Sequence, residues 1–356
     1  KGQKMSKSKG NVMDPLELCD KYGTDSVRFT LAAMAAQGRD IKLSEQRIAG
    51  YRNFVTKIWN SAKFCEMNEC VYSPEFRPAE VEVSLSRWII SKLAQTEKGI
   101  RLAIEAYRFN DAAELLYHFT WHTYCDWFLE FVKPVFQGSD EKVQIELRAT
   151  ASWVRDQILI IAHPIMPFVT EELWATTGID RDSNLIAGTW PEYKNLLVPA
   201  AEDEMDWIVD LISAIRSARS KLNVPPSAMI ELKVRGFDAD LVARLNANIS
   251  LVIVNARLAA INFVTEIPDI EGLVHVVFGQ ATLLLVLEGV VDLEKERRRL
   301  ENEQSKLETE IGKHSTKLNS EDFLRKAPDN VISDVRQKKQ VAEGKTVSQA
   351  EARERM

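Results

Sequence analysis

The chain has 356 residues, of which 45% are hydrophobic and 28% charged, and its formal net charge is −6. This composition is that of a globular protein with ample material for a core, and the length suggests two or three domains. A net negative charge gives no general attraction to polyanions, so any nucleic-acid site has to be a local basic patch. The longest apolar stretch, 281–291, contains Glu288 and falls short of the roughly 20 residues of a membrane-spanning helix.

The four cysteines, Cys19, Cys65, Cys70 and Cys125, form no C-x-x-C pair, which favours a reduced setting and argues against a cysteine-based zinc site. The amino-terminal lysines are followed by no apolar segment of the kind found in signal peptides. We therefore expect a cytoplasmic protein without membrane attachment.

The chain begins with a cationic, glycine-containing loop, KGQKMSKSKGN, and continues into two short helices. Asp14 is suited to cap the first helix, Pro15 to its first position and Gly23 to its end. Asp25 is predicted to cap the second helix, which we expect to stop at Gly38.

Residues 45–195 are predicted to form an antiparallel bundle of helices, because apolar residues recur at i, i+3, i+4 and i+7 and strand patterns are absent. Ser44 and Glu45 open its first long helix, and Pro74 and Pro78 mark the break after it. Further helices are expected at 84–107, 109–136 and 140–162, and a short one begins at Thr170.

Residues 196–289 are predicted to form a small α/β domain. An amphipathic helix at 202–222 is followed by the turn NVPPS and by four expected strands, MIELKVRG, AINFVTE, HVVFGQ and ATLLLVLEG. The segment LVARLNANISLVIVNAR, 241–257, is expected to be one helix. The basic run RSARSK, 216–221, is open to two readings, an RNA contact or a solvated face.

Residues 290–356 are predicted to form an antiparallel coiled-coil hairpin that Pro328 interrupts. Leu293, Leu300 and Leu307 repeat every seven residues, while Ile311 and Leu318 occupy the partner position, which Arg297 and Gln304 weaken. The predicted fold is therefore multidomain and mainly α. Its expected parts are a loop segment (1–44), a helix bundle (45–195), a small α/β domain (196–289) and a hairpin arm (290–356).

The loop residues Lys4, Met5, Ser6, Lys7 and Ser8 can bind a polyphosphate, since lysine offers a compact mobile charge and small neighbours let the backbone approach a ligand. Such a loop could clamp a triphosphate and neutralise charge during nucleotidyl transfer. The five-residue pattern by itself favours the other reading, a solvated linker.

The longer stretch KMSKSKGNVMDPLELCDKYGTDSVRF resembles the end of the catalytic domain of class I aminoacyl-tRNA synthetases. Further segments resemble the valyl-tRNA synthetase family, and the resemblance covers essentially the whole chain. The isoleucyl and leucyl relatives share the bundle but not the hairpin. The segments are AAMAAQGRDIKLS, YRNFVTKIWNSAKF, CDWFLEFVKP, HPIMPFVTEELW and LNSEDFLRKAPDNV.

The resemblance implies an ATP-dependent, AMP-forming valine–tRNA ligase with ATP, valine and tRNA(Val) as partners, which we expect to be a monomer. Lys4 and Lys7 would contact the ATP phosphates, Lys7 would stabilise the transition state of valyl-adenylate formation, and Mg²⁺ would arrive with ATP, without a protein metal site. No H-I-G-H-like segment is present. We therefore expect a carboxyl-terminal part of the enzyme that is inactive alone. The alternative is a non-catalytic RNA-binding or coiled-coil interaction protein.

Asn53, Lys57, Asn60 and Phe64 are spaced i, i+4, i+7 and i+11, so they share one face of the first bundle helix. Two amides, a cation and an aromatic ring suit single-stranded RNA through hydrogen bonds, a phosphate contact and stacking. The alternative is an ordinary amphipathic helix with Phe64 buried. The family resemblance places Lys57, Asn60 and Phe64 where anticodon contacts are expected, and Arg47 and Arg52 are weaker candidates.

His118, His122 and Asp126 lie at i, i+4 and i+8, a spacing that could hold zinc. The segment is not H-E-x-x-H, and we predict a partly buried polar seam instead. Trp121 nearby is expected to pack in the core or between helices. In the hairpin, the resemblance implies tRNA contact by the region, while interleaved acids suit a solvated coiled-coil face. Its basic candidates are Lys295, Arg297, Arg298, Arg299, Lys313, Lys317, Arg325, Lys326, Lys338 and Lys339, with Phe323 near the tip.

Overall fold

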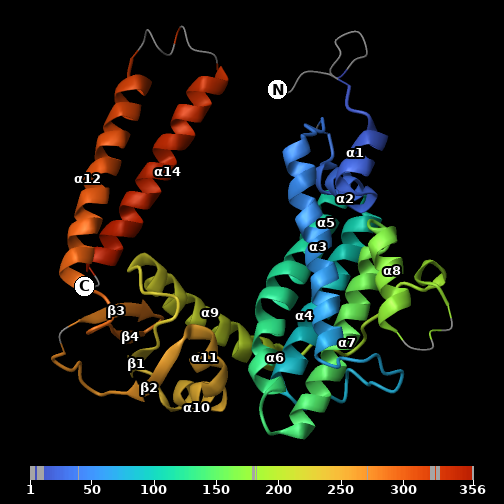
Figure 1. Ribbon diagram of the computed structural model, residues 1–356, viewed down its shortest axis with the longest axis horizontal. Coiled ribbons are helices and arrows are strands. Elements are labelled where there is room, and N and C mark those ends of the chain that lie inside the picture. Colours follow the sequence, from blue (N-terminus) through green and yellow to red (C-terminus); the bar gives the residue numbers. More distant parts are fainter. Residues whose placement is uncertain are drawn as a thin grey trace. The chain divides into compact units, whose positions relative to one another are not determined.

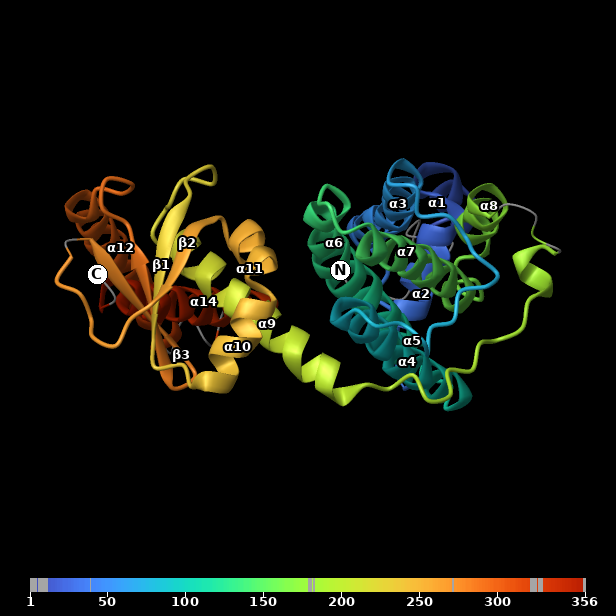
Figure 2. The same ribbon diagram turned by 90° about the horizontal axis from the view of Figure 1, so that it is seen from below.

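The computed structural model describes Met5, Arg181, Arg325 and the ranges 12–38, 40–178, 183–270, 272–320 and 329–354. Contacts divide the chain into two compact units, 1–206 and 207–356, and the helix α9 (Pro199–Lys221) crosses this division. The described residues are mainly helical, with a four-stranded sheet in the second unit (Figures 1 and 2). The predicted mainly α, multidomain fold is therefore confirmed. None of the described helices is both long and apolar enough to cross a membrane.

The first unit contains the predicted helix bundle. Helix α4 packs against α5 and α7, and α3 packs against α7 and α8 (Figure 1). Large side chains on four elements, Phe54, Trp88, Tyr124 and Phe131, are fully buried between them. Burying a side chain of this size stabilises the fold by about 1.5–3 kcal/mol. The elements are α1 (Pro15–Tyr22), α2 (Thr24–Met34), α3 (Glu45–Met67), α4 (Ser84–Glu105), α5 (Phe109–His118), the π-helix η2 (Phe119–Phe128), α6 (Leu129–Phe136), α7 (Glu141–Ala162), α8 (Pro167–Thr177) and the short η3 (Leu185–Ala187).

Three predicted helix ends are confirmed. Asp14 Oδ1 accepts a hydrogen bond from the Leu16 amide at 2.8 Å, and Pro15 is the first residue of α1. Gly23 ends α1 with φ at +90°, a conformation that glycine adopts without steric cost. At α3, Ser44 Oγ accepts from the Arg47 amide at 3.4 Å. These caps depend on neighbours within three residues, which a sequence pattern captures.

The prediction that Asp25 caps α2 is wrong. Helix α2 begins at Thr24 and ends at Met34, short of Gly38. The Asp25 carboxylate is buried and accepts hydrogen bonds from the amides of Phe168 at 3.3 Å and Val169 at 2.6 Å, in the first turn of α8. Burial raises the pKa of Asp25, although these amides act in the opposite direction. Asp25 therefore ties α2 to α8, which starts three residues before the predicted Thr170.

The second unit is built on a sheet with the strand order β2-β1-β4-β3. Strand β1 (Ile230–Arg235) pairs in parallel with β2 (Leu258–Phe263) and antiparallel with β4 (Ala281–Val286), which pairs antiparallel with β3 (Leu273–Phe278). Ile230, Leu232 and Val234 of β1 are buried and alternate with more exposed residues, as one covered sheet face requires. The four predicted strands are all present.

The single helix predicted at 241–257 is two helices in the structure. Helix α10 (Ala239–Ala247) ends at Asn248, whose φ of −117° and ψ of 15° are not helical, and α11 (Ile249–Ala256) follows. Helix α11 packs against β2 (Figure 2). It ends at Arg257, which has a left-handed backbone conformation with φ at +55°.

Helices α12 (Leu293–Leu318) and α14 (Asp329–Glu354) lie side by side (Figure 1). On α14, Val335 and Ala342 are buried, seven residues apart. On α12, the expected seam residues Leu307, Ile311 and Leu318 are half-buried, as is His314, which occupies the next position of the leucine series. The side chains of Leu293 and Leu300 and the predicted break at Pro328 lie outside what the structure describes.

Candidate nucleic-acid interface

The predicted ATP-binding loop lies almost entirely outside the described residues. Lys4, Ser6, Lys7 and Ser8 are not among them, so their phosphate contacts stay a prediction. Met5 is described, and 48% of it is exposed.

Helix α3 separates its residues into a buried and an accessible side. Phe54 and Ile58 are buried, as predicted. On the accessible side Asn53 and Asn60 are exposed, while Lys57 and Phe64 are half-buried; we call these four residues the α3 face. The predicted spacing therefore brings the four candidate side chains to one side of a regular helix.

Lys57 has the most contacts within the α3 face. Its Nζ donates to Oδ1 of Asp126 at 2.8 Å and lies 5.2 Å from the ring centroid of Trp121. Burial lowers the pKa of Lys57, but the hydrogen bond and charge of Asp126 raise it by more, so the net shift is upward. The α3 face thus carries a charged amine in a fixed position between a carboxylate and an indole ring.

The π-helix η2 brings Trp121 and Asp126 together beside Lys57. At 3.6 residues per turn, an α-helix would separate two residues five positions apart by about 140° around its axis. The i→i+5 bonding of a π-helix instead places such residues nearly above one another. The wide winding of 119–128 is therefore what allows both side chains to reach the same lysine.

Trp121 connects the α3 face to the core. Its ring stacks on Tyr117, with centroids 5.4 Å apart, and on Phe54, at 6.4 Å. The ring of Phe54 in turn packs against Phe29, with ring centroids 4.9 Å apart. Trp121 therefore packs between α3 and α5, as predicted, and it is half-buried rather than fully in the core. This aromatic series fixes the position of the surface on which Lys57 lies.

Phe64 lies at the other end of the α3 face beside α6. The Nζ of Lys133 is 5.7 Å from the Phe64 ring centroid and is 2.5 Å from Oε1 of Glu130. Phe64 is half-buried, so it is neither a fully buried core residue nor a freely exposed plate. A base stacking on its open side would do so next to a cation.

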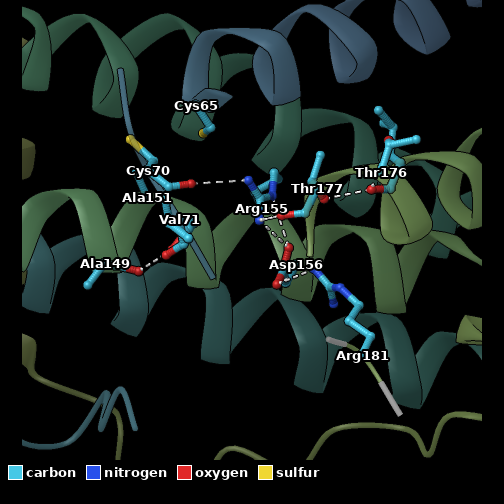
Figure 3. Close-up of polar contacts among 12 residues, drawn as sticks. Cys65, Cys70, Val71, Ala149, Ala151, Arg155, Asp156, Thr176, Thr177 and Arg181 are labelled. Carbon is cyan, nitrogen blue, oxygen red and sulfur yellow. Dashed lines mark hydrogen bonds and ion pairs between the residues drawn. The ribbon is translucent and has the colours of Figure 1, made fainter. Parts of the chain in front are cut away.

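A buried network holds the segment that follows α3 (Figure 3). The Arg155 guanidinium donates to Asp156 at 2.8 Å and to the carbonyl of Cys70 at 3.4 Å. Arg181 donates to the other oxygen of Asp156, also at 2.8 Å. The Cys70 amide bonds back to the carbonyl of Cys65 at 2.8 Å. Because Cys65 adjoins Phe64, this network anchors the end of the helix that carries the α3 face.

The two candidate metal-binding histidines are more exposed than the predicted polar seam. His118 and His122 both lie at the surface, with ring centroids 5.3 Å apart, and Nδ1 of His122 is 3.3 Å from Oδ2 of Asp126. Throughout the described ranges, no group of three or more His, Cys, Asp or Glu side chains is suited to hold a metal ion. His122 instead contacts the carboxylate that fixes Lys57.

Several basic candidates of the hairpin pair with acids on their own helix. Lys338 lies 2.8 Å from Asp334, and Lys339 lies 3.6 Å from Glu343. Exposed i, i+4 pairs of this kind contribute little to stability. Lys326 and Phe323 lie outside the described residues. The contact of this region with tRNA stays a prediction.

Three family models match the chain. They are described as tRNA synthetases class I (I, L, M and V), at 1–44, the anticodon-binding domain of tRNA ligase, at 86–234, and the valyl tRNA synthetase tRNA binding arm, at 292–356. A valine–tRNA ligase of Bradyrhizobium diazoefficiens is 41% identical over 390 residues, covering all of this chain, and one of Agrobacterium fabrum is 45% identical over 95% of it. The chain belongs to the valyl-tRNA synthetase family. Its α3 face lies between the first two matches, so no family model assigns it a role.

The chain spans about 40% of the length of these valyl-tRNA synthetase relatives: 40% for the Bradyrhizobium protein and 36% for the Agrobacterium protein. The matched region is their carboxyl-terminal part. A solved LeuRS–tRNA–LeuAMS complex of Agrobacterium radiobacter K84 aligns with 74% of this chain and 32% of its own, at 17% identity. The TM-score of this alignment is 0.45.

Asp126 and Lys133 are neighbours of the α3 face that sequence analysis did not assign to it. The sequence spacing groups Asp126 with the histidines, and no pattern in the sequence points to Lys133. The contacts of both depend on how η2 and α6 pack beside α3, and a regular helical period assigned across 119–128 misplaces their side chains. In such a segment, an aromatic residue and an acid five positions apart are the signal that could have found Trp121 and Asp126.

Proposed function

We propose that this chain binds tRNA as part of a valine–tRNA ligase, and that the α3 face contacts the anticodon. The observation that carries this proposal is the fixed position of Lys57 between Asp126 and Trp121, on a face with accessible amides at Asn53 and Asn60. A fixed cation, amides and an aromatic ring are what recognition of unpaired bases requires. The matches to an anticodon-binding domain and a tRNA-binding arm support tRNA(Val) as the partner.

The whole enzyme would form valyl-adenylate from valine and ATP, with Mg²⁺ bound to the nucleotide. Lys4 and Lys7, with Met5, Ser6 and Ser8, would supply the phosphate-binding loop. The match to class I synthetases at 1–44 favours this role over a non-catalytic RNA-binding or coiled-coil interaction protein. We further propose a monomer that acts in the cytoplasm.

The test is the affinity of the chain for a tRNA(Val) transcript and for the same transcript with an altered anticodon. Lys57→Ala and Phe64→Ala should each weaken binding of the matched transcript, by roughly 5- to 150-fold if about 1–3 kcal/mol of contact is lost. Matched controls are Lys63→Ala, an exposed lysine of α3, and Phe168→Ala, an exposed phenylalanine of α8.

Folded Lys57 and Phe64 variants that bind the matched transcript as tightly as the controls would refute the role of the α3 face. The catalytic part of the proposal has a separate test in ATP–pyrophosphate exchange. The isolated chain should show no valine-dependent exchange, and substantial exchange would contradict the expectation that this part of the enzyme is inactive alone.

A further inference from the structure

The second unit contains a cavity of about 480 Å³ at the carboxyl ends of α9 and α11. Three arginines and no carboxylate line this cavity, which we call the arginine pocket. Two of the arginines come from the basic run 216–221, for which the sequence left open an RNA contact or a solvated face. Its lining residues are Arg216, Arg219, Ser220, Asn223, Val224, Pro226, Asn255, Ala256 and Arg257.

Two of these arginines are held by neutral carbonyl groups. Arg219, which is 7% exposed, donates to the carbonyls of Arg257 at 3.1 Å, Pro225 at 3.2 Å and Ala228 at 2.7 Å. Arg216 Nε donates to the carbonyl of Asn255 at 2.8 Å. A carbonyl fixes a guanidinium without cancelling its charge, so the buried Arg219 is a positioned cation rather than a member of a solvated face.

The charges of the arginine pocket repel one another. Within the described part of the chain, neither Arg219 nor Arg257 forms an ion pair with a carboxylate. Burial lowers the pKa of Arg219, and the nearby Arg257 lowers it further. Like charges at one cavity raise its electrostatic energy, and an anion entering the cavity relieves that repulsion.

Two residues of the arginine pocket have a strained backbone. Asn223 has φ at +49° and Arg257 has φ at +55°, both in the left-handed region that residues with a side chain seldom occupy. Residues with such a backbone conformation cluster at ligand sites. Of the three lining arginines, Arg216 and Arg257 are exposed and Arg219 is buried.

We propose that the arginine pocket binds a backbone phosphate of the tRNA, as a contact separate from the α3 face. Arginine is suited to phosphate because its planar fork can donate two parallel hydrogen bonds. RNA is favoured over free phosphate because the matched tRNA-binding arm adjoins the same end of α9, where Arg299 of α12 lies 3.5 Å from the carbonyl of Lys221. The inference rests on the proposed function, namely that the chain binds tRNA.

The test uses the full chain with Arg257→Gln, which removes a charge at a side chain for which no hydrogen bond is found among the described residues. Arg235→Gln, at an exposed arginine that ends β1 outside the cavity, is the charge-matched control. Affinity for tRNA(Val) is measured between about 50 and 200 mM salt. Arg257→Gln should weaken binding severalfold and reduce the slope of log K against log salt by about one, whereas Arg257→Lys should restore much of the loss.

Because a backbone phosphate carries no sequence information, the loss should be equal for matched and altered anticodons. Equal binding by Arg257→Gln and Arg235→Gln would overturn the inference. If Lys57→Ala weakens binding of the matched transcript in the same assay, that result leaves the proposed function standing. A thermal shift by inorganic pyrophosphate that Arg257→Gln abolishes, with unchanged tRNA affinity, would assign the arginine pocket to free phosphate and also overturn the inference.

Discussion

Lys57 and Asp126 form an ion pair at 2.8 Å across 69 positions of sequence, and both side chains are still partly exposed. The carboxylate neutralises much of the charge that Lys57 would otherwise offer to RNA, and it also fixes where the amine lies. The α3 face therefore gives up long-range attraction for a defined geometry. This arrangement is expected of a surface that distinguishes one RNA sequence from another.

Asp126→Asn should increase the affinity of the chain for all tRNAs while reducing its preference for the matched anticodon. The released charge of Lys57 attracts phosphates in general, but the amine loses its fixed position. The measurement is the ratio of the affinities for the matched and the altered transcript. Glu114→Gln, at an exposed acid of α5, makes the same change in net charge and should leave the ratio unaltered. An undiminished ratio in Asp126→Asn would show that Asp126 does not position Lys57.

Gly178→Ala should destabilise the first unit by about 1–3 kcal/mol. A β-carbon on Gly178 would lie 1.6 Å from Nε of Arg181, so Arg181 would have to leave Asp156 and the face of Trp174. Gly50→Ala, in the open middle of α3, should instead stabilise by about 0.5–1 kcal/mol, because alanine favours the helix. Urea unfolding followed by circular dichroism compares the two, and equal stability of both variants would contradict this account of Gly178.

His314→Leu should stabilise the hairpin of α12 and α14 by about 1 kcal/mol. The side chain of His314 is 14% exposed, and its buried Nδ1 has no hydrogen-bond partner among the described residues. Leucine would continue the seven-residue series at the same position. Hydrogen exchange of α12 amides measures the effect locally, and Lys313→Leu, at the exposed neighbouring position, should give no such protection.

The pH dependence of the free energy of unfolding should reveal the raised pKa of Asp25. Its pKa is raised in the folded chain, chiefly by burial, so the native state holds this proton more tightly than the unfolded state does. Stability relative to Asp25→Asn should therefore fall as pH rises from the ordinary aspartate value of about 3.9 to the raised native pKa, and then level off. Urea unfolding at several pH values tests this, and a relative stability that rises over that interval would contradict the sign.

The features that could be predicted from sequence depend on near neighbours or on simple periods. Asp14 and Ser44 cap helices within three residues of themselves, and the spacing of Asn53, Lys57 and Asn60 fixes a shared face. Asp25 was mispredicted because its hydrogen-bond partners lie more than 140 residues away on α8. At Asn248 a local turn within an otherwise helical period divides the expected helix in two.

The contacts of the α3 face could not be obtained in the same way. Lys57 was identified, but its partner Asp126 lies on another element and was assigned to a different possible site. The arginine pocket was also beyond reach, since Arg257 joins Arg216 and Arg219 only after α11 returns to the end of α9. A run of charged residues in the sequence shows only which side chains are present. Whether they line a cavity or a solvated surface depends on their burial and on residues that are distant in the sequence.

The π-helix at 119–128 has a practical consequence for protein engineering. The π-helix changes the direction in which the side chains of α6 point relative to those of α5. Counting heptads across it therefore assigns these side chains to the wrong face of the helix. Deleting a single residue there would change the winding of this segment, and with it the position of Asp126 relative to Lys57. A transplant of the α3 face onto a regular bundle would therefore have to include this irregular segment as well.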